Sequence, residues 1–309
     1  MIDRLTDAII KKKNPTVVGL DPTLEMLPPF MKKEAFSLHG NDPKVVADMF
    51  FEFNKNIIDA LSDIVPAVKP QIAMYERFGV PGLEAYSRTC EYARLKGLIV
   101  IGDIKRGDIS STAAAYAAHI GGVDINGERR MTWYEDAVTL NPYMGSDGIK
   151  PFLENCREYR KGLFILVKTS NPSSSELQDL VLQDGRRVYE AAADLVDEWG
   201  SGLMGKYGYS SVGAVVGATH KEEGESLRKA HPHTFFLVPG YGAQGASASD
   251  VAGFFDERGL GAIINSSRGI TAAYQKDPSY RSQDYARAAA DAAVKMRDSI
   301  NQAMGNVLL

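Results

Sequence analysis

The sequence predicts an α/β protein folded as a (β/α)8 TIM barrel, with eight parallel strands and additional rim segments. Two observations support this fold class. Eight short apolar runs rich in β-branched residues recur along the 309-residue chain, and segments with helical spacing separate them. Strand and helix alternating eight times is typical of a parallel sheet closed into a barrel. Barrels of this length commonly form one domain, so we expect residues 1–309 to be a single barrel domain.

Each expected strand is short and mostly apolar. The runs are Thr16–Asp21, Ala67–Met74, Leu98–Lys105, Ala137–Pro142, Gly162–Ser170, Val212–Thr219, Phe235–Gly242 and Gly261–Ser267. Their length suits strands that are buried on both faces of a parallel sheet. An open, doubly wound sheet is the structural alternative. It is disfavoured because the G-x-G-x-x-G sequence typical of that fold is absent after the first strand.

Segments with apolar residues at helical spacing fall between these runs. The expected helices are Lys44–Ile64, Pro81–Lys96, Ser110–Ile120, Ser175–Gly200, Glu222–Ala230, a stretch near Ser247–Arg258, and Asp284–Met304. Two connections, Pro22–Pro43 and Gly121–Asp136, are longer than a barrel requires. We expect them to be lids, interface elements or decorations of the rim.

The composition argues against several classes of protein. The net charge of −4 does not indicate the basic surface that nucleic acids or anionic membranes attract. Cys90 and Cys156 are far apart and lack metal-ligand spacing, so we expect free thiols and a reducing, cytoplasmic location. The first residues, MIDRLTDAIIKKKN, do not form a signal peptide, and no apolar run is long enough to span a membrane.

Polar residues interrupt the expected strands at one end only. They are Asp21, Lys69, Asp103, Lys105, Asn141, Lys168, Thr169 and Ser170. Strands buried on both faces are normally apolar, and burying a charge costs several kcal/mol unless the charge is paired. Barrel enzymes carry their active sites at the C-terminal ends of the strands. We therefore expect the functional site at that end.

The densest group of charges lies in the segment DIKRGD, from Asp103 to Asp108. Residues two apart on a strand face the same side, so Asp103 and Lys105 should point together, while Gly107 lets the chain turn back. The Lys105 ammonium would then lie between two carboxylates. Each attraction is on the order of 4 kcal/mol at about 4 Å and an effective dielectric near 20, before desolvation. The alternative is a structural salt bridge, with Asp108 as a helix N-cap.

A second group of residues suits phosphate binding. The segment PGYGAQG follows the seventh expected strand, and Arg268 follows the eighth. Glycines leave backbone N–H groups accessible, Gln244 adds an amide donor, and Arg268 supplies a planar charged fork. Loops after strands seven and eight commonly bind phosphate in barrels. The alternative is a set of turn glycines beside a surface arginine.

The sequence also contains a lysine within the second expected strand and five scattered histidines. Lys69 is either a core lysine that reaches the surface or an amine that forms a Schiff base with a substrate. The five histidines show no shared ligand spacing, so we expect no metal site.

These residues lie in motifs that together resemble the orotidine 5′-phosphate decarboxylase family, in particular its longer bacterial branch. The motifs are VVGLDPT, VKPQIAMYERFG, DIKRGDISSTA, LNPYMGSDG, KTSNPSS, PGYGAQG and NSSRGI, in that order over nearly the whole chain. The resemblance implies decarboxylation of orotidine 5′-phosphate to uridine 5′-phosphate in pyrimidine biosynthesis, with no metal and no organic cofactor. It also implies a homodimer whose active sites are shared across the interface.

The resemblance implies a role for each candidate residue. Lys105 resembles the proton donor to pyrimidine C6, and Asp103 resembles the carboxylate set against the carboxylate of the substrate. Asp108 resembles the aspartate that completes the site of the other subunit. The residues expected at the substrate are Asp21, Lys69 and Thr112 at the ribose, Ser170 at the pyrimidine with Thr169 as its competitor, and Gln244 and Arg268 at the phosphate.

Two rival functions remain at the level of the sequence. A related sugar-phosphate decarboxylase or aldolase on the same barrel would use Mg²⁺ and would need an additional acidic ligand from the second strand. This chain has Lys69 there, and Glu76 is more distant. A non-catalytic phosphate-binding barrel would bind uridine 5′-phosphate without turnover.

Overall fold

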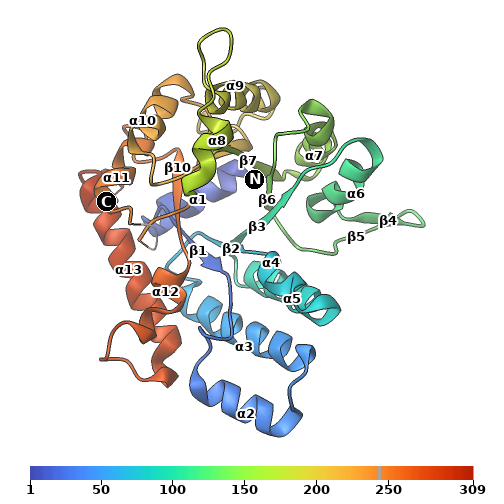
Figure 1. Ribbon diagram of the computed structural model, residues 1–309, viewed down its shortest axis with the longest axis vertical. Helices are drawn as coiled ribbons and strands as arrows, with labels where there is room; N and C mark the ends of the chain where they lie inside the picture. The colour runs from blue at the N-terminus through green and yellow to red at the C-terminus, as the bar shows by residue number, and fades with distance from the viewer. Residues whose placement is uncertain (243–244, 309) are drawn as a thin grey trace.

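The computed structural model describes residues 1–242 and 245–308, and it contains a closed parallel barrel surrounded by helices (Figure 1). Around the barrel the strands follow the order β1-β10-β9-β8-β7-β6-β3-β2. They are β1 Thr16–Leu20, β2 Ala67–Pro70, β3 Ile99–Arg106, β6 Ala137–Leu140, β7 Gly162–Lys168, β8 Val212–Val216, β9 Phe236–Val238 and β10 Ala262–Ser266. All eight expected strands are confirmed, and each pairs in parallel with its neighbours.

Helices cover the outside of the barrel (Figure 1). The α-helices are α1 Ile2–Lys12, α2 Pro29–His39, α3 Pro43–Leu61, α4 Ala73–Glu76, α5 Gly79–Leu95, α6 Ser110–Gly121, α7 Ser146–Tyr159, α8 Ser175–Gln178, α9 Val188–Gly200, α10 Lys221–Ala230, α11 Ala248–Val251, α12 Arg268–Thr271 and α13 Tyr285–Ala303. Short 3-10 turns are η1 Pro172–Ser174, η2 Ala252–Phe254, η3 Ala273–Gln275 and η4 Ser282–Asp284.

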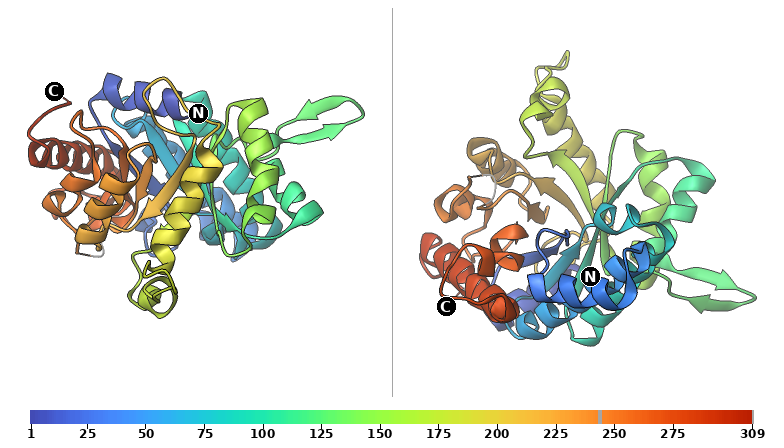
Figure 2. Two further views of the ribbon diagram at one scale, coloured as in Figure 1. Left: turned by 90° about the horizontal axis from the view of Figure 1, so that it is seen from above. Right: turned by 60° about the horizontal axis from the view of Figure 1, so that its bottom comes forward.

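Helix α1 closes the N-terminal end of the barrel. We call the opposite end, where the strands have their C-terminal ends, the mouth. Its buried residues Leu5 and Ile9 belong to the same apolar cluster as the inward-facing strand residues Val17, Ile101 and Phe164. Figure 2 (left) shows α1 at one end of the strands and the α8–α9 segment beyond the other end. The N-terminal end of the barrel is thus filled with hydrocarbon, and polar chemistry is left to the mouth.

One expected helix is wrong. The segment Ser175–Gly200 is not continuous: α8 ends at Gln178, α9 begins at Val188, and a turn separates them. In that turn Leu182 N donates a hydrogen bond to Arg186 O at 2.8 Å, and Gly185 has φ 89°. An Asp-Gly pair at 184–185 is a strong turn signal, because glycine adopts positive φ at little cost.

The two long rim connections contain regular structure. Residues 22–43 include α2, which packs beside α3, and residues 121–136 include an antiparallel hairpin of β4 Val123–Ile125 and β5 Glu128–Arg130. The hairpin projects from the side of the barrel (Figure 2, left). Helices α1 and α7 were not expected from the sequence.

Cys90 and Cys156 are both buried and unbridged, as expected. Among the described residues, no helix is both long and apolar enough to cross a membrane.

Candidate active site

The inner face of the barrel changes from apolar to polar at a fixed height. On four strands, the residue two positions after a buried apolar residue is polar and buried: Ala67 leads to Lys69, Ile101 to Asp103, Ala137 to Thr139, and Ile263 to Asn265. Residues two apart on a strand face the same side, so these polar groups share the interior above the hydrocarbon layer. The candidate site therefore begins where the apolar filling of the barrel stops.

Asp103 is the centre of this polar layer. Its Oδ2 atom accepts from Lys69 Nζ at 2.6 Å, and its Oδ1 atom accepts from both Lys105 Nζ and, at 2.9 Å, Thr139 Oγ1. The Asp103 side chain is 9% exposed, whereas the Lys105 side chain is 45% exposed. A buried carboxylate thus holds two ammonium groups of very different accessibility.

The charges around Asp103 shift the pKa values of the buried groups. Burial alone would raise the pKa of Asp103, but the charges of Lys69 and Lys105 outweigh it and hold that pKa well below its ordinary value. Burial would likewise lower the pKa of Lys69, yet Asp103 and Asp21 together raise it. Asp103 and Lys69 are therefore both ionised, because each has opposite charges beside it.

The DIKRGD segment turns in a different way from that expected. Lys105 itself adopts a left-handed conformation with φ 44°, as does Ser110 with φ 52°, whereas Gly107 is not among the glycines with positive φ. A long side chain rarely adopts this conformation. The backbone N–H of Lys105 donates to Thr139 Oγ1 at 3.0 Å, so Thr139 fixes both Asp103 and Lys105. Sequence reasoning missed Thr139, although its inward position on β6 follows from the strand alternation.

Asp108 does not flank Lys105 within its own chain, so that expectation is wrong. Its Oδ1 atom accepts from the N–H of Ile109 at 2.8 Å, and helix α6 has no side-chain N-cap. The alternative N-cap role is therefore also wrong. The local arrangement is the reverse of the expected one, because one carboxylate lies between two ammonium groups. Thr112, on the first turn of α6, is exposed.

A pocket of about 810 Å³ opens at the mouth and joins several candidate residues. Asp21, Lys69, Asp103 and Arg268 all line it. Arg268 is exposed and begins α12 directly after β10. The pocket thus has acidic groups directly after β1 and on β3, and an exposed arginine after β10. Gln244, the other expected phosphate ligand, lies outside the described residues.

Two of the three polar residues that end β7 have structural partners. Lys168 is buried and pairs with Asp179 at 2.5 Å. The N–H of Thr169 donates to Gln178 Oε1 at 2.9 Å, and Gln178 Nε2 donates to Thr169 Oγ1 at 2.7 Å. Within the described part of the chain, no hydrogen bond occupies the hydroxyl of Ser170. This difference favours Ser170 over Thr169 as a ligand-binding group.

The structure shows the environment of Lys69 and the distribution of possible metal ligands. Lys69 does not reach the surface, because its side chain is 5% exposed and paired with Asp103. The described residues contain no group of three or more His, Cys, Asp or Glu side chains that could hold a metal ion.

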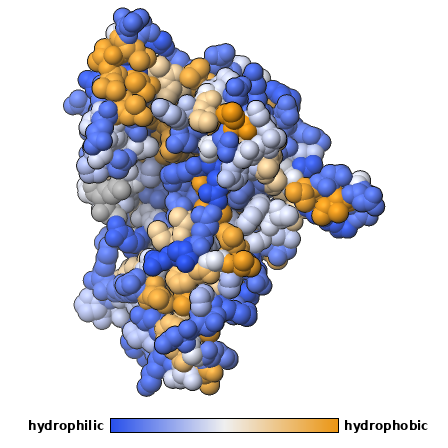
Figure 3. All heavy atoms as spheres, turned by 45° about the vertical axis from the view of Figure 1, so that its right-hand side comes forward, coloured by the Kyte–Doolittle hydropathy of each residue, from blue (hydrophilic) through white to orange (hydrophobic). Residues whose placement is uncertain are grey.

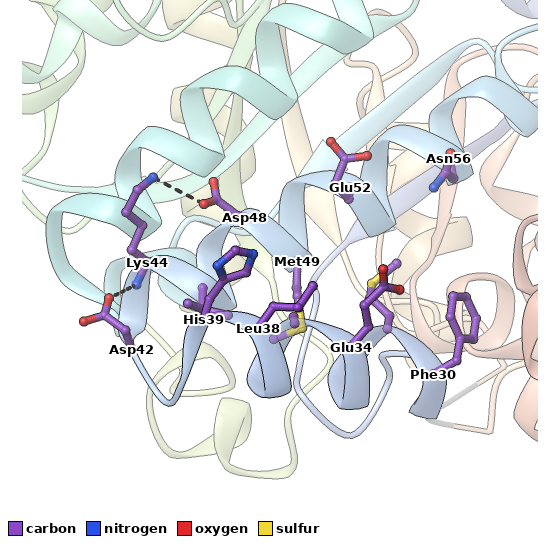
Figure 4. Close-up of a pocket in the computed structure, with 13 residues that line it drawn as sticks. Phe30, Glu34, Leu38, His39, Asp42, Lys44, Asp48, Met49, Glu52 and Asn56 are labelled. Carbon is purple, nitrogen blue, oxygen red and sulfur yellow. Dashed lines mark hydrogen bonds and ion pairs between the residues drawn. The ribbon is translucent and has the colours of Figure 1, made fainter.

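A separate hollow of about 840 Å³ lies between α2 and α3, away from the barrel mouth (Figure 4). Its lining mixes apolar residues such as Phe30 and Leu38 with acids such as Glu34 and Glu52. None of the candidate site residues that the structure describes lines it, so the mouth pocket is the candidate active site.

Comparisons with a family profile and with individual relatives find the same kind of protein. Residues 16–284 match the sequence profile described as "Orotidine 5′-phosphate decarboxylase / HUMPS family". The chain is 42% identical over 304 residues to the orotidine 5′-phosphate decarboxylase of Caldicellulosiruptor saccharolyticus, covering 98% of both chains. It is 44% identical over 275 residues to the enzyme of the same name from Rhodopirellula baltica, covering 89% of both.

A solved structure is similar over the whole fold. The crystal structure of an orotidine-monophosphate-decarboxylase from Toxoplasma gondii superposes with a TM-score of 0.78 at 33% sequence identity. The match covers 99% of this chain and 97% of the other.

We predict that Asp103→Asn destabilises the fold in a pH-dependent manner. Removing one partner of a buried ion pair costs about 3–5 kcal/mol. Because the folded pKa of Asp103 lies below its unfolded value near 4, this stabilisation is complete above about pH 5 and is lost as the pH falls through the folded pKa. Urea unfolding of both proteins should show a difference in unfolding free energy that is constant above about pH 5 and shrinks below about pH 4.

The exposed Arg186–Asp184 pair provides the control, and Asp184→Asn should change stability little. A difference for Asp103→Asn that is absent, or that grows towards acid pH, would contradict the role assigned to the buried pairs.

Proposed function

The chain belongs to the orotidine 5′-phosphate decarboxylase / HUMPS family, and from this premise we propose how it decarboxylates orotidine 5′-phosphate to uridine 5′-phosphate in pyrimidine biosynthesis. The observation that carries the mechanism is the contact of the buried Asp103 carboxylate with both Lys69 and the more exposed Lys105. Lys105 is the accessible ammonium of the pair, so we assign it to the reacting carbon.

The proposed reaction needs one proton donor. The bond between C6 and the carboxyl carbon breaks, CO2 leaves, and the electron pair stays on C6. The Lys105 ammonium stabilises this developing negative charge and then transfers a proton to C6. Solvent returns a proton to the lysine amine. Asp103 positions Lys105 and lies against the departing carboxylate.

The remaining candidate residues bind the substrate in this proposal. Arg268 and Gln244 hold the phosphate, Asp21 and Lys69 contact the ribose, and Ser170 meets the pyrimidine ring. Binding energy from the phosphate, remote from C6, can hold the substrate carboxylate near Asp103. The lining of the mouth pocket by Asp21, Lys69 and Arg268 supports this distribution.

We propose that the reaction uses neither a metal ion nor an organic cofactor. The purified protein should decarboxylate orotidine 5′-phosphate at the same rate with and without EDTA, measured as the loss of substrate absorbance. Loss of activity in EDTA would favour the Mg²⁺-dependent rival. Binding of uridine 5′-phosphate without any turnover would favour the non-catalytic barrel.

We also propose a homodimer with composite active sites. Asp108 and Thr112 do not contact the Asp103 cluster of their own chain, and neighbouring Ile109 is 43% exposed. The first turn of α7 packs against Asp108, because a Cβ on Gly148 would stand 2.8 Å from the Asp108 carbonyl oxygen. The surface formed by these segments suits a second copy that takes Asp108 and Thr112 into its own site.

Apolar side chains are exposed over the same side of the mouth. They include Tyr143, Met144, Leu177, Leu180, Val181 and Leu182. Figure 3 shows apolar surface gathered around the α8–α9 turn at its upper left. Exposed apolar patches commonly mark interaction sites, which supports an interface here. We further propose that residues 1–309 form one barrel domain. We also propose that the protein acts in the cytoplasm.

Mixing two inactive variants tests the composite site. In a heterodimer of Asp108→Ala and Lys105→Ala subunits, one site has both wild-type residues and the other has neither. Equal mixing with subunit exchange should therefore restore roughly a quarter of wild-type activity, since half of the dimers are mixed and each has one intact site. Activity no greater than the sum of the separate variants, or a fully active monomer, would refute the composite site.

A further inference from the structure

Five buried side-chain atoms lack a hydrogen-bond partner among the described residues. They are Asp21 Oδ1, Asn54 Oδ1, Arg106 Nε, Asn265 Oδ1 and Asn301 Oδ1. Buried polar groups are nearly always paired, so each such atom calls for an explanation. Two of the five, Asp21 and Asn265, line the mouth pocket. Both free atoms are hydrogen-bond acceptors, which points to a ligand that donates.

Asp21 and Asn265 belong to one small cluster on adjacent strands. Strand β1 pairs with β10 so that Val17 lies opposite Asn265. Asn265 Nδ2 donates a long hydrogen bond of 3.5 Å to Ser267 Oγ. A Cβ on Gly19 would collide with the Ser267 side chain and stand 3.2 Å from Asp21 Oδ2. The glycine therefore leaves room for Asp21, Ser267 and Asn265 to gather at one wall of the pocket.

The acceptor character of these atoms narrows the part of the substrate that they can meet. The phosphate and carboxylate of orotidine 5′-phosphate present acceptors, whereas the two ribose hydroxyls and the N3–H of the base present donors. The base is assigned to Ser170 beyond β7, which is three strands away from β10 around the barrel. Arg268, assigned to the phosphate, follows Asn265 by three residues, and the ribose adjoins the phosphate.

We propose that Asn265 is a substrate-positioning residue whose Oδ1 atom accepts a hydrogen bond from one ribose hydroxyl, beside Asp21. Asn265 is 7% exposed, so its free carbonyl is shielded from bulk water and is held on a strand rather than on a mobile loop. A site built to accept from a hydroxyl discriminates against ligands that lack it, because the buried acceptor is then left unpaired. This inference rests on the proposed function and adds a source of selectivity for ribonucleotides.

Product binding tests the proposal without requiring turnover. We would measure the affinities of uridine 5′-phosphate and its 2′-deoxy and 3′-deoxy analogues for the wild type, Asn265→Leu and Asn265→Asp. Removing one hydrogen bond of this kind should weaken uridine 5′-phosphate binding about tenfold in Asn265→Leu. The wild type should prefer uridine 5′-phosphate over one of the two deoxy analogues, and in Asn265→Leu this preference should be smaller by the same factor.

Two variants keep the result interpretable. Asn265→Asp retains an acceptor of the same shape and should preserve the hydroxyl preference even if Asn265→Leu folds poorly. Asn301→Leu removes another buried amide, which donates to Lys13 O and does not line the mouth pocket, so both affinity ratios should stay at the wild-type values.

The proposal is overturned if Asn265→Leu binds all three nucleotides with wild-type ratios, or if Asn265→Asp loses the preference as fully as Asn265→Leu does. The second outcome would mean that the amide donates rather than accepts. A failure of the proposed function is distinguishable, because the wild type would then not consume orotidine 5′-phosphate, whatever the three binding affinities are.

Discussion

The Asp103 carboxylate, buried between two ammonium groups, is the interaction on which the rest of the site depends. Lys69 is buried on an inner face whose lower positions are apolar, and such a charge is tolerated only when it is paired. Asp103 supplies that pair, and its second oxygen contacts Lys105 and Thr139. The register of β2, β3 and β6 is therefore tied to one charge cluster, which positions the accessible ammonium.

The same region of β3 links the active site to the proposed subunit interface. Gly102 precedes Asp103, and a Cβ there would collide with the buried carboxylate of Glu135. Glu135 accepts from Tyr86 and pairs at 2.9 Å with His119, which lies on α6. Helix α6 also carries Thr112. The outer face of β3 thus anchors the helix that would reach the other subunit, while the inner face holds the chemistry.

Much of the fold could be predicted from sequence because eight apolar runs separated by helical segments permit few arrangements. Helix α1 was harder to find, since its role as a plug depends on contacts with strands distant in sequence. The alternation of side chains along a strand predicted that Asp103 and Lys105 point to the same side. The Lys69–Asp103 pair was not, because it joins neighbouring strands whose register the sequence does not specify. Asn265 was missed because one amide within an apolar run carries no distinctive pattern.

In the proposed mechanism Lys105, and not Lys69, protonates the C6 carbanion. The two ammonium groups contact the same carboxylate and differ in accessibility, with side chains 45% and 5% exposed. The decisive experiment compares Lys105→Ala with Lys69→Ala for turnover, uridine 5′-phosphate binding and borohydride trapping. We expect Lys105→Ala to lose turnover by several orders of magnitude while still binding the product, Lys69→Ala to lose less, and borohydride to trap no adduct. A greater loss in Lys69→Ala, or a reduced lysine–substrate adduct, would contradict this mechanism.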